Sequence, residues 1–339
     1  MPGHDIVAIG SSAGGIEALK KLFAELPPDL PAAFLVVQHV GEVSILPDIL
    51  GSVGRYPARH PEDREVPKPG IIYIAPPSRH LQLEDGMLRL VRGPRENTFR
   101  PSVDVLFRSV ARDCGPRAIG VVLTGYLGDG AAGLQAIKQR GGIAVIQDPM
   151  DAEYPSMPMT ALREVDADRC LRLAEMPAYL AEAIRQPVTE IKEYPVSRQL
   201  ELETDISKQD MDRGQMMAAV ETLGDRTELS CPDCSGGLWQ VRGPGPLRFR
   251  CHTGHAYTAE AFLASQGTAL EGALRSALRL MEEKYSFLQR MRERTKASGA
   301  GESVLRYEER ASRLESEARQ IRRLLKESVA VDSQAGEVI

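Results

Sequence analysis

The sequence predicts a doubly wound, mostly parallel α/β sheet over about the first 185 residues. Short apolar runs alternate there with helical patterns, and the runs are continuous, as expected of strands covered on both faces. After about residue 186 the pattern changes to a compact Cys/His segment and then two helical patterns. The fold class is therefore α/β, followed by a small Cys3His zinc ribbon and a helical hairpin.

The predicted elements alternate between strand and helix along the first part of the chain. The expected strands cover residues 6–9, 34–37, 71–75, 119–123 and 143–146. The helical patterns cover residues 16–26, 103–110 and 131–140, the second of them beginning after Ser102 as a capping residue. Residues 80–91 alternate in polarity around Asp85–Gly86, which indicates a β-hairpin.

Changes in composition indicate four segments. Residues 1–186 form the α/β domain, and 187–230, rich in acidic residues with few apolar clusters, is expected to be a linker. Residues 231–260 hold the ribbon. Residues 266–330 hold the helical hairpin, whose second helix carries a heptad pattern and offers a face for a partner helix.

Composition excludes several classes of protein. The 42 basic and 47 acidic residues give a net charge of −5, which argues against a non-specific nucleic-acid surface. No run of about 18 apolar residues is present, so we expect no membrane insertion. The N-terminus lacks a signal-peptide pattern, and five cysteines form no disulfide framework, so we expect a cytoplasmic protein.

Ser12 lies in the pattern Gly10-x-Ser12-x-Gly14, directly after a predicted strand and before a helix. Such a turn lifts a serine out of the sheet and places helix N-terminal amides near the reacting carbon. A simple turn and a degenerate phosphate-binding loop are the alternatives. No Gly-Lys-Ser/Thr follows, and the spacing of a dinucleotide fingerprint is not met.

His39 ends the second predicted strand, so it shares the carboxyl edge of the sheet with Ser12 and is the candidate base. A nucleotide-binding protein would instead carry a ribose-binding carboxylate at this position. The other histidines of this domain are weaker candidates, because His4 is terminal, His60 lies in a charged loop and His80 opens the hairpin.

Asp129 follows the strand at 119–123 and reaches the same edge, where it could orient the histidine. It could instead cap the helix that follows it. Asp148, at the end of the next strand, competes for the orienting role. The order serine, histidine, aspartate differs from that of an α/β-hydrolase.

These residues together resemble the catalytic domain of CheB, the chemotaxis protein-glutamate methylesterase. The matching stretches are residues 8–15, 38–39, 73–76, 100–107 and 122–133. The resemblance covers about residues 5 to 185 and implies the doubly wound α/β fold. It also implies a catalytic triad of Ser12, His39 and Asp129.

The resemblance implies that backbone amides of Ala13 and Tyr126 form the oxyanion hole. The family often has threonine at Ala13, and its Thr-Gly-Met-Gly loop is Thr124-Gly125-Tyr126-Leu127 here. Family members commonly carry an N-terminal receiver domain. Ser12 leaves no room for one before it, so we expect no control by a phosphorylated aspartate of the same chain.

The activity implied is hydrolysis of glutamate γ-methyl esters on a methylated chemoreceptor or another methylated signalling protein, with glutamine deamidation as a related reaction. No cofactor is implied for catalysis. The alternative is a catalytically silent scaffold that binds partners through the ribbon and the helices. The intact Ser/His/Asp set favours the enzyme.

The spacing CxxC and CxxxH within residues 231–255 predicts a metal site. Cys231, Cys234, Cys251 and His255 would supply four ligands for a structural, tetrahedral zinc ion. His252 is the alternative fourth ligand, and an unrelated cluster of reduced thiols is the other interpretation.

Overall fold

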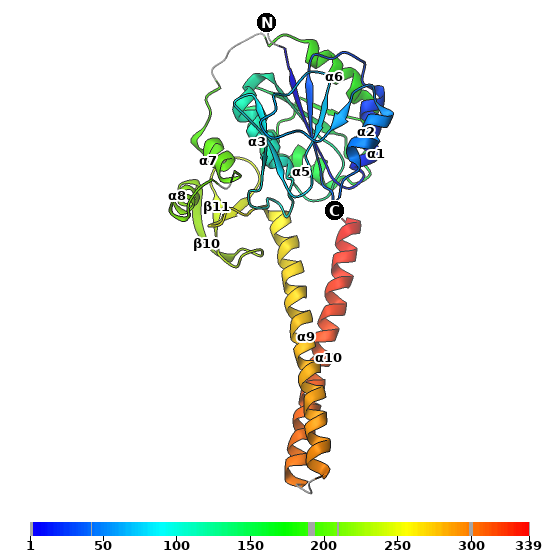
Figure 1. The fold of residues 1–339 in the computed structure, drawn as a ribbon, viewed down its shortest axis with the longest axis vertical. Helices are drawn as coiled ribbons and strands as arrows, with labels where there is room; N and C mark the ends of the chain where they lie inside the picture. The colour runs from blue at the N-terminus through cyan, green and yellow to red at the C-terminus, as the bar shows by residue number, and fades with distance from the viewer. Residues whose placement is uncertain (1–2, 42, 189–193, 209, 298–300, 339) are drawn as a thin grey trace. The chain divides into compact units, whose positions relative to one another are not determined.

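The computed structural model describes residues 3–41, 43–188, 194–208, 210–297 and 301–338. The chain forms two compact units, residues 1–262 and 263–339. The first unit contains the main α/β sheet and the ribbon, and the second contains most of a pair of long helices (Figure 1).

A seven-stranded parallel sheet in the order β3-β4-β2-β1-β7-β8-β9 forms the centre of the first unit. Its strands are β1 (Ile6–Ser11), β2 (Ala33–Gln38), β3 (Ala58–Arg59), β4 (Ile72–Ile74), β7 (Ala118–Val122), β8 (Ile143–Gln147) and β9 (Arg169–Leu171). The predicted α/β fold class is confirmed. Of these seven strands, the sequence pattern missed β3 and β9, which have two and three residues.

Helices cover both faces of this sheet (Figure 1). On one face lie α1 (Gly15–Glu25), α2 (Leu46–Val53) and α6 (Met176–Arg185), and on the other α3 (Val103–Cys114), α4 (Ala131–Gln139) and α5 (Ser156–Glu164). Successive residues of β1 alternate between the two cores, with Val7 on the α1 side and Ala8 on the α3 side. Every residue of β1 is buried, which explains its continuous apolar run.

The predicted hairpin is present as β5 (His80–Glu84) and β6 (Met87–Val91), which pair in antiparallel register. Asp85 and Gly86 have φ of 51° and 73°, the left-handed conformation that a two-residue hairpin turn of this kind requires. The hairpin packs on α3, where the Leu83 N–H donates to Ser109 Oγ at 3.0 Å.

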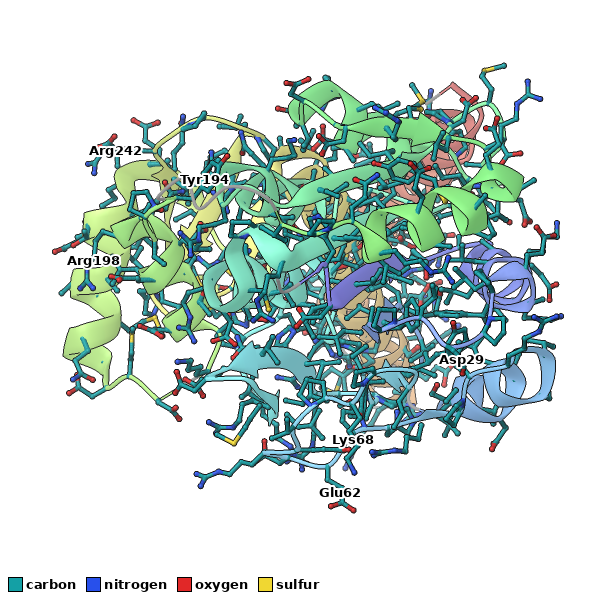
Figure 2. The ribbon with its side chains drawn as sticks, turned by 90° about the horizontal axis from the view of Figure 1, so that it is seen from above. Asp29, Glu62, Lys68, Tyr194, Arg198 and Arg242 are labelled. Atoms are coloured by element: carbon teal, nitrogen blue, oxygen red, sulfur yellow. The ribbon has the colours of Figure 1, made fainter. Side chains whose placement is uncertain are left out.

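The described part of 187–230 is not the linker that composition predicted. It contains α7 (Arg198–Ile206), α8 (Arg213–Leu223) and β10 (Gly224–Ser230). Ser197 and Asp212 cap the two helices by accepting backbone N–H groups. Six buried apolar side chains of these helices pack with Trp239 of the ribbon, namely Leu202, Ile206, Met216, Ala219, Val220 and Leu223. Figure 2 shows Arg198 and Arg242 on one side of this unit and Asp29 toward the opposite side.

The ribbon, residues 224–258, is a four-stranded antiparallel sheet and begins earlier than the predicted 231. Its strands are β10, β11 (Gly237–Val241), β12 (Arg248–Cys251) and β13 (Ala256–Thr258). Leu238, Phe249 and Tyr257 of the ribbon pack with Phe262 in a small core. So small a core indicates that the ribbon needs further stabilisation.

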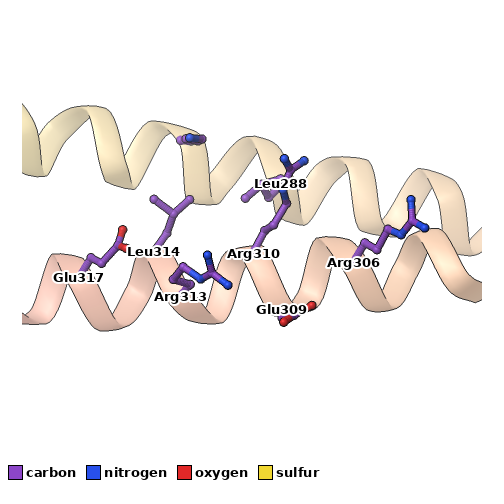
Figure 3. Close-up of a pocket in the computed structure, with 8 residues that line it drawn as sticks. Leu288, Arg306, Glu309, Arg310, Arg313, Leu314 and Glu317 are labelled. Atoms are coloured by element: carbon purple, nitrogen blue, oxygen red, sulfur yellow. The ribbon is translucent and has the colours of Figure 1, made fainter.

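The predicted C-terminal helices are α9 (Ala259–Ala297) and α10 (Gly301–Val338). Within the second unit, Leu288 of α9 and the heptad positions Ala311 and Ala318 of α10 are buried. Figure 3 shows Leu288 and Leu314 directed into the groove between the two helices, among mainly charged side chains. None of the helices in the described ranges is both long enough and apolar enough to span a bilayer.

Gly10 sets the distance between β1 and α3. A Cβ at Gly10 would lie 2.2 Å from Val103 Cγ1, so we expect Gly10→Ala to lower the free energy of unfolding by about 1–3 kcal/mol. Urea titration followed by circular dichroism measures this loss. Gly10→Ala/Val103→Ala should recover part of it.

Gly51 of α2 provides the matched control, because a Cβ there would meet nothing within 4 Å. We expect Gly51→Ala to leave stability unchanged or to raise it by up to about 1 kcal/mol. An equal loss in both variants would show that close packing on Val103 is not the cause.

Candidate active site

Ser12 lies in the tight turn between β1, which ends at Ser11, and α1, which begins at Gly15. Gly14 has φ of 71° and forms the N-cap of α1. The turn is fixed by Gln38, whose Nε2 donates to the Ser12 carbonyl at 2.7 Å and whose Oε1 accepts from Ser11 Oγ at 2.7 Å. A side chain at Gly15 would collide with Gln38 Oε1, so this turn requires glycine.

His39 follows β2 at the same edge of the sheet, because Ser11 and Gln38 are register partners in parallel strands. Its Nδ1 lies 3.1 Å from Ser12 Oγ, and its Nε2 lies 2.8 Å from Asp129 Oδ2. An ionised Asp129 fixes the proton on Nε2, which leaves Nδ1 to accept the serine hydroxyl proton. The ring of Phe99 stacks on the imidazole, with centroids 3.6 Å apart and planes 9° apart.

Asp129 is fully buried at the N-terminus of α3. Besides the His39 ring it accepts hydrogen bonds from four donors, namely Asn97 Nδ2 at 2.9 Å, Ser102 Oγ at 2.8 Å, Val103 N at 2.7 Å and Asp104 N at 3.1 Å. Burial alone would raise the pKa of Asp129, but the hydrogen bond from the His39 ring, together with those from Asn97 and Val103, holds the pKa below its ordinary value.

Two capping expectations are corrected by these contacts. Asp129 caps a helix, but that helix is α3, distant in sequence, and not α4, whose N-cap is Gly130 with φ of 102°. Ser102 occupies the N-cap position of α3 but its side chain makes no capping hydrogen bond, because it donates to Asp129.

The competing candidates have other partners. Asp148 accepts the N–H of Met150 in its own loop, at 2.9 Å. His60 Nδ1 lies 2.9 Å from the Ile74 carbonyl. His80 Nε2 donates to the Pro94 carbonyl at 2.9 Å, while its Nδ1 accepts the Ser102 N–H at 3.2 Å. The structure therefore brings Ser12, His39 and Asp129 together and leaves the alternatives outside the group.

The loop after β7 lies directly against Ser12. A Cβ at Gly125 would lie 2.7 Å from Ser12 Cβ, and the Ser12 N–H donates to the Thr124 carbonyl at 3.0 Å. Among the described residues, the N–H groups of Ala13 and Tyr126 donate to no protein acceptor. Tyr126 itself is exposed and lies beside Tyr154.

Sequence reasoning missed Asn97 and Phe99, both in the loop between β6 and α3. Asn97 bridges two buried carboxylates, since its Nδ2 lies 2.9 Å from Asp129 Oδ1 and 2.8 Å from Asp104 Oδ2. Burial and the negative charge of Asp129 raise the pKa of Asp104. The proximity of Asn97 to the Arg-Pro-Ser-Val-Asp motif was the only sequence signal for it.

A cleft of about 240 Å³ opens beside His39 and Phe99. Arg95 and Arg100 also line it. Burial and then the positive charges of Arg95 and Arg92 lower the pKa of Arg100, so the three guanidinium groups lie close to one another. The cleft therefore suits a polar, acidic ligand.

The four predicted metal ligands lie together in the ribbon, with Cys231, Cys234, Cys251 and His255 presenting ligand atoms within 4.8 Å of one another. Cys234 Sγ and Cys251 Sγ are 3.7 Å apart, and His255 Nδ1 lies 3.5 Å from Cys251 Sγ. Two ligand atoms of a tetrahedral zinc ion lie about 3.6–3.8 Å apart, so these two pairs have separations close to those that such an ion requires. His252 instead packs over Gly236 and is not part of the cluster.

A serine, histidine and aspartate linked in this order at the carboxyl edge of an α/β sheet is the arrangement of a serine hydrolase. The family model described as CheB methylesterase matches residues 7–180. The chain therefore belongs to the CheB methylesterase family. This confirms the resemblance found in the sequence.

Individual relatives agree with this assignment. A Leptospira interrogans protein, provisionally named a protein-glutamate methylesterase/protein-glutamine glutaminase, is 39% identical over 179 residues, which are 51% of this chain and 91% of the relative. A Pseudomonas syringae protein-glutamate methylesterase/protein-glutamine glutaminase is 40% identical over 176 residues, 51% of this chain and 52% of the relative. The crystal structure of the Thermotoga maritima CheB methylesterase catalytic domain matches with a TM-score of 0.51 and 34% identity, over 54% of this chain and 99% of that one.

His80 makes the start of α3 sensitive to acid. Burial lowers its pKa from 6.5 to about 4, so its stabilising contribution is complete above pH 6.5 and is lost as the pH falls toward 4. We expect the difference in unfolding free energy between wild type and His80→Gln to shrink by about 2 kcal/mol from pH 7 to pH 5. Urea titrations at both pH values measure it.

The comparison with His80→Gln is necessary because Asp104, whose pKa is raised, titrates in the opposite sense over the same range. A difference between the two proteins that does not change with pH would show that His80 is not the acid-sensitive group.

Proposed function

We propose that this protein hydrolyses glutamate γ-methyl esters on a methylated chemoreceptor-type protein, using Ser12 as nucleophile, His39 as general base and Asp129 as the group that orients His39. The observation that carries this proposal is the continuous hydrogen-bonded chain from Ser12 Oγ through the imidazole to Asp129 Oδ2, with distances of 3.1 and 2.8 Å. The names of the relatives, protein-glutamate methylesterase/protein-glutamine glutaminase, support the same substrate class.

In the first step His39 Nδ1 takes the Ser12 hydroxyl proton as Oγ bonds to the γ-carbonyl carbon of the ester. Asp129 stabilises the resulting imidazolium through its bond to Nε2. Nδ1 then returns the proton to the leaving oxygen, so methanol departs and an acyl-serine remains. Water attacks this acyl group by the same route and frees the glutamate carboxylate.

The oxyanion of each tetrahedral intermediate needs donors that have no partner in the resting enzyme. The backbone N–H groups of Ala13 and Tyr126 are the proposed donors, because neither donates to protein in the described residues. Such donors each contribute about 3 kcal/mol in other enzymes. Since they are backbone groups, the departures at Ala13 and Tyr126 from the family's usual residues leave the chemistry intact.

The same site could deamidate glutamine, because an amide presents its γ-carbonyl carbon in the same position and ammonia would replace methanol as the leaving group. The arginines beside the cleft favour substrate segments rich in glutamate. We place the reaction in the cytoplasm, where the five cysteines, none of which forms a disulfide, would remain reduced.

The ribbon is proposed to hold one structural zinc ion through Cys231, Cys234, Cys251 and His255 Nδ1. All four positions of the tetrahedron would be filled by protein, so the ion would contribute folding energy to a ribbon whose own core is small.

Ser12→Ala tests the proposed nucleophile. We expect methanol release from a methyl-esterified chemoreceptor fragment to fall by at least about 10³-fold, because His39 then has no hydroxyl to activate. Gas chromatography of the methanol measures this rate. Ser52→Ala, which removes a serine from the exposed surface of α2, should retain the wild-type rate.

Equal release by wild type and Ser12→Ala would mean that Ser12 is only a turn residue. No release by either protein, with binding to the fragment intact, would favour the catalytically silent scaffold.

The zinc site has its own test. We expect the purified protein to contain one equivalent of zinc by elemental analysis, and Cys234→Ser and His255→Asn to lose it because each removes one of four ligands. Cys170→Ser and His252→Asn are matched controls outside the cluster and should keep the ion. Retention of zinc by His255→Asn together with its loss from His252→Asn would reverse the assignment of the fourth ligand.

A further inference from the structure

The ribbon packs on the segment that precedes α3, here called the active-site loop and comprising residues 92–101. The Asn97 N–H donates to the Ala256 carbonyl at 2.8 Å, and the Ala256 N–H donates to the Arg95 carbonyl at 3.3 Å. The active-site loop thereby pairs with β13 at the edge of the ribbon sheet. A Cβ at Gly254 would lie 2.8 Å from Pro94, so the two segments are also in close contact.

A buried ionic network fixes the same junction. Glu96 of the active-site loop accepts from Arg108 of α3 at 2.6 Å, from Arg250 of β12 at 3.1 Å and from Ser207 Oγ at 2.8 Å. All of these side chains are buried. Against the effect of burial, Arg108 and Arg250 lower the pKa of Glu96 to about 2, so it stays ionised. Loss of either arginine would leave the buried Glu96 carboxylate with only one of these two cationic partners.

Asn97 is the point at which this junction reaches the proposed triad. Its Oδ1 accepts the Thr258 N–H of β13 at 2.8 Å, and its Nδ2 donates to Asp129 and Asp104. All the hydrogen-bonding atoms of the amide are thus used. The backbone at Asn97 and Thr98 has φ of 52° and 75°, a strained conformation that the surrounding contacts must maintain.

The second loop of the site also contacts the ribbon. Leu127, which follows the proposed oxyanion donor Tyr126, packs with the apolar core of the ribbon. A Cβ at Gly128 would lie 3.6 Å from Thr258 Oγ1. The residue that follows Gly128 is Asp129, so the ribbon supports the proposed triad from two sides.

We infer that Asn97 is a positioning residue for Asp129 and that the ribbon holds it in place, so that folding of the ribbon around its metal sets the catalytic efficiency of the esterase site. Asn97 acts through Asp129 and does not touch the reacting ester. Its amide donates a neutral hydrogen bond where two carboxylates, Asp129 and Asp104, face each other. This inference rests on the proposed function.

Two substitutions at Asn97 separate its contact with Asp129 from its contact with Thr258 of the ribbon. Asn97→Gly suits the positive φ and removes the whole amide, whereas Asn97→Asp keeps an acceptor for Thr258 but replaces the donor with a third carboxylate. We expect kcat to fall about 10- to 100-fold with little change in KM, because Asp129 is displaced.

The pH profile identifies the cause of that fall. Loss of the Asn97 donor should raise the pKa of Asp129, so the acid limb of kcat/KM should move to higher pH. The movement should be larger in Asn97→Asp, whose added charge faces Asp129. Activity that falls with an unchanged pH profile in both variants would mean that Asn97 only supports folding, which would overturn the assignment.

The role of the ribbon is tested in the full chain with Cys234→Ser and with wild type treated with a zinc chelator. Both should lower kcat/KM, and amide hydrogen exchange should show loss of protection at Asn97, whose N–H bonds to Ala256. Gln240→Ala, on the exposed surface of β11, is the control and should change neither.

If the ribbon acts through Asn97, the double variant Cys234→Ser/Asn97→Gly should lower kcat by less than the product of the two separate fold-decreases. Effects that simply multiply, or metal-free protein with wild-type kcat/KM and full protection at Asn97, would overturn the link to the ribbon. If wild type itself shows no Ser12-dependent release, the proposed function fails, while the hydrogen-exchange result still decides whether the ribbon holds Asn97.

Discussion

The whole site depends on the hydrogen bonds that the buried Asp129 carboxylate accepts at the start of α3. A carboxylate without exposure to solvent is unfavourable unless its charge is compensated, and here five donors surround it. Two of them are backbone N–H groups at the N-terminus of a helix, where the helix dipole also favours negative charge. The imidazole of His39 is therefore held by a carboxylate that is itself fixed, and Ser12 meets the one ring nitrogen that remains free to accept a proton.

This arrangement requires α3 to approach the sheet closely, and the glycines of the first domain follow from that requirement. Gly10 and Gly130 both face Val103, the first residue of α3, at distances that leave no room for a side chain. Gly133 faces Asp104 and Phe107, which lie within about one turn of Val103 on the same helix. The glycines before Ser12 and after Asp129 are therefore required for close packing against α3 as well as for the turns in which they lie. The sequence pattern alone does not show this packing role.

Sequence reasoning succeeded where the structure depends on short-range order. Continuous apolar runs identified the strands, and parallel strands then place Ser12, His39 and Asp129 at one edge without any further information. It failed where partners come from far along the chain. Asn97 gains its role from Thr258, which is 161 residues later, and the helices α7 and α8 gain their core from Trp239. Ser197 and Asp212 cap these two helices in the structure, whereas the prediction of a linker rested on acidic composition and the scarcity of apolar clusters.

The same long-range contacts determine what a metal in the ribbon could contribute. Four protein ligands would complete its tetrahedron, so its proposed part lies in folding the ribbon and not in binding the ester. The ribbon, however, is packed against the α/β domain, where Arg250 neutralises Glu96 of the active-site loop and β13 supplies the hydrogen bonds that hold Asn97. The folded ribbon would thus help to fix the position of the Asp129 carboxylate at the edge of the main sheet. A metal site and a catalytic site that share no ligand would in this way depend on one another through a single loop.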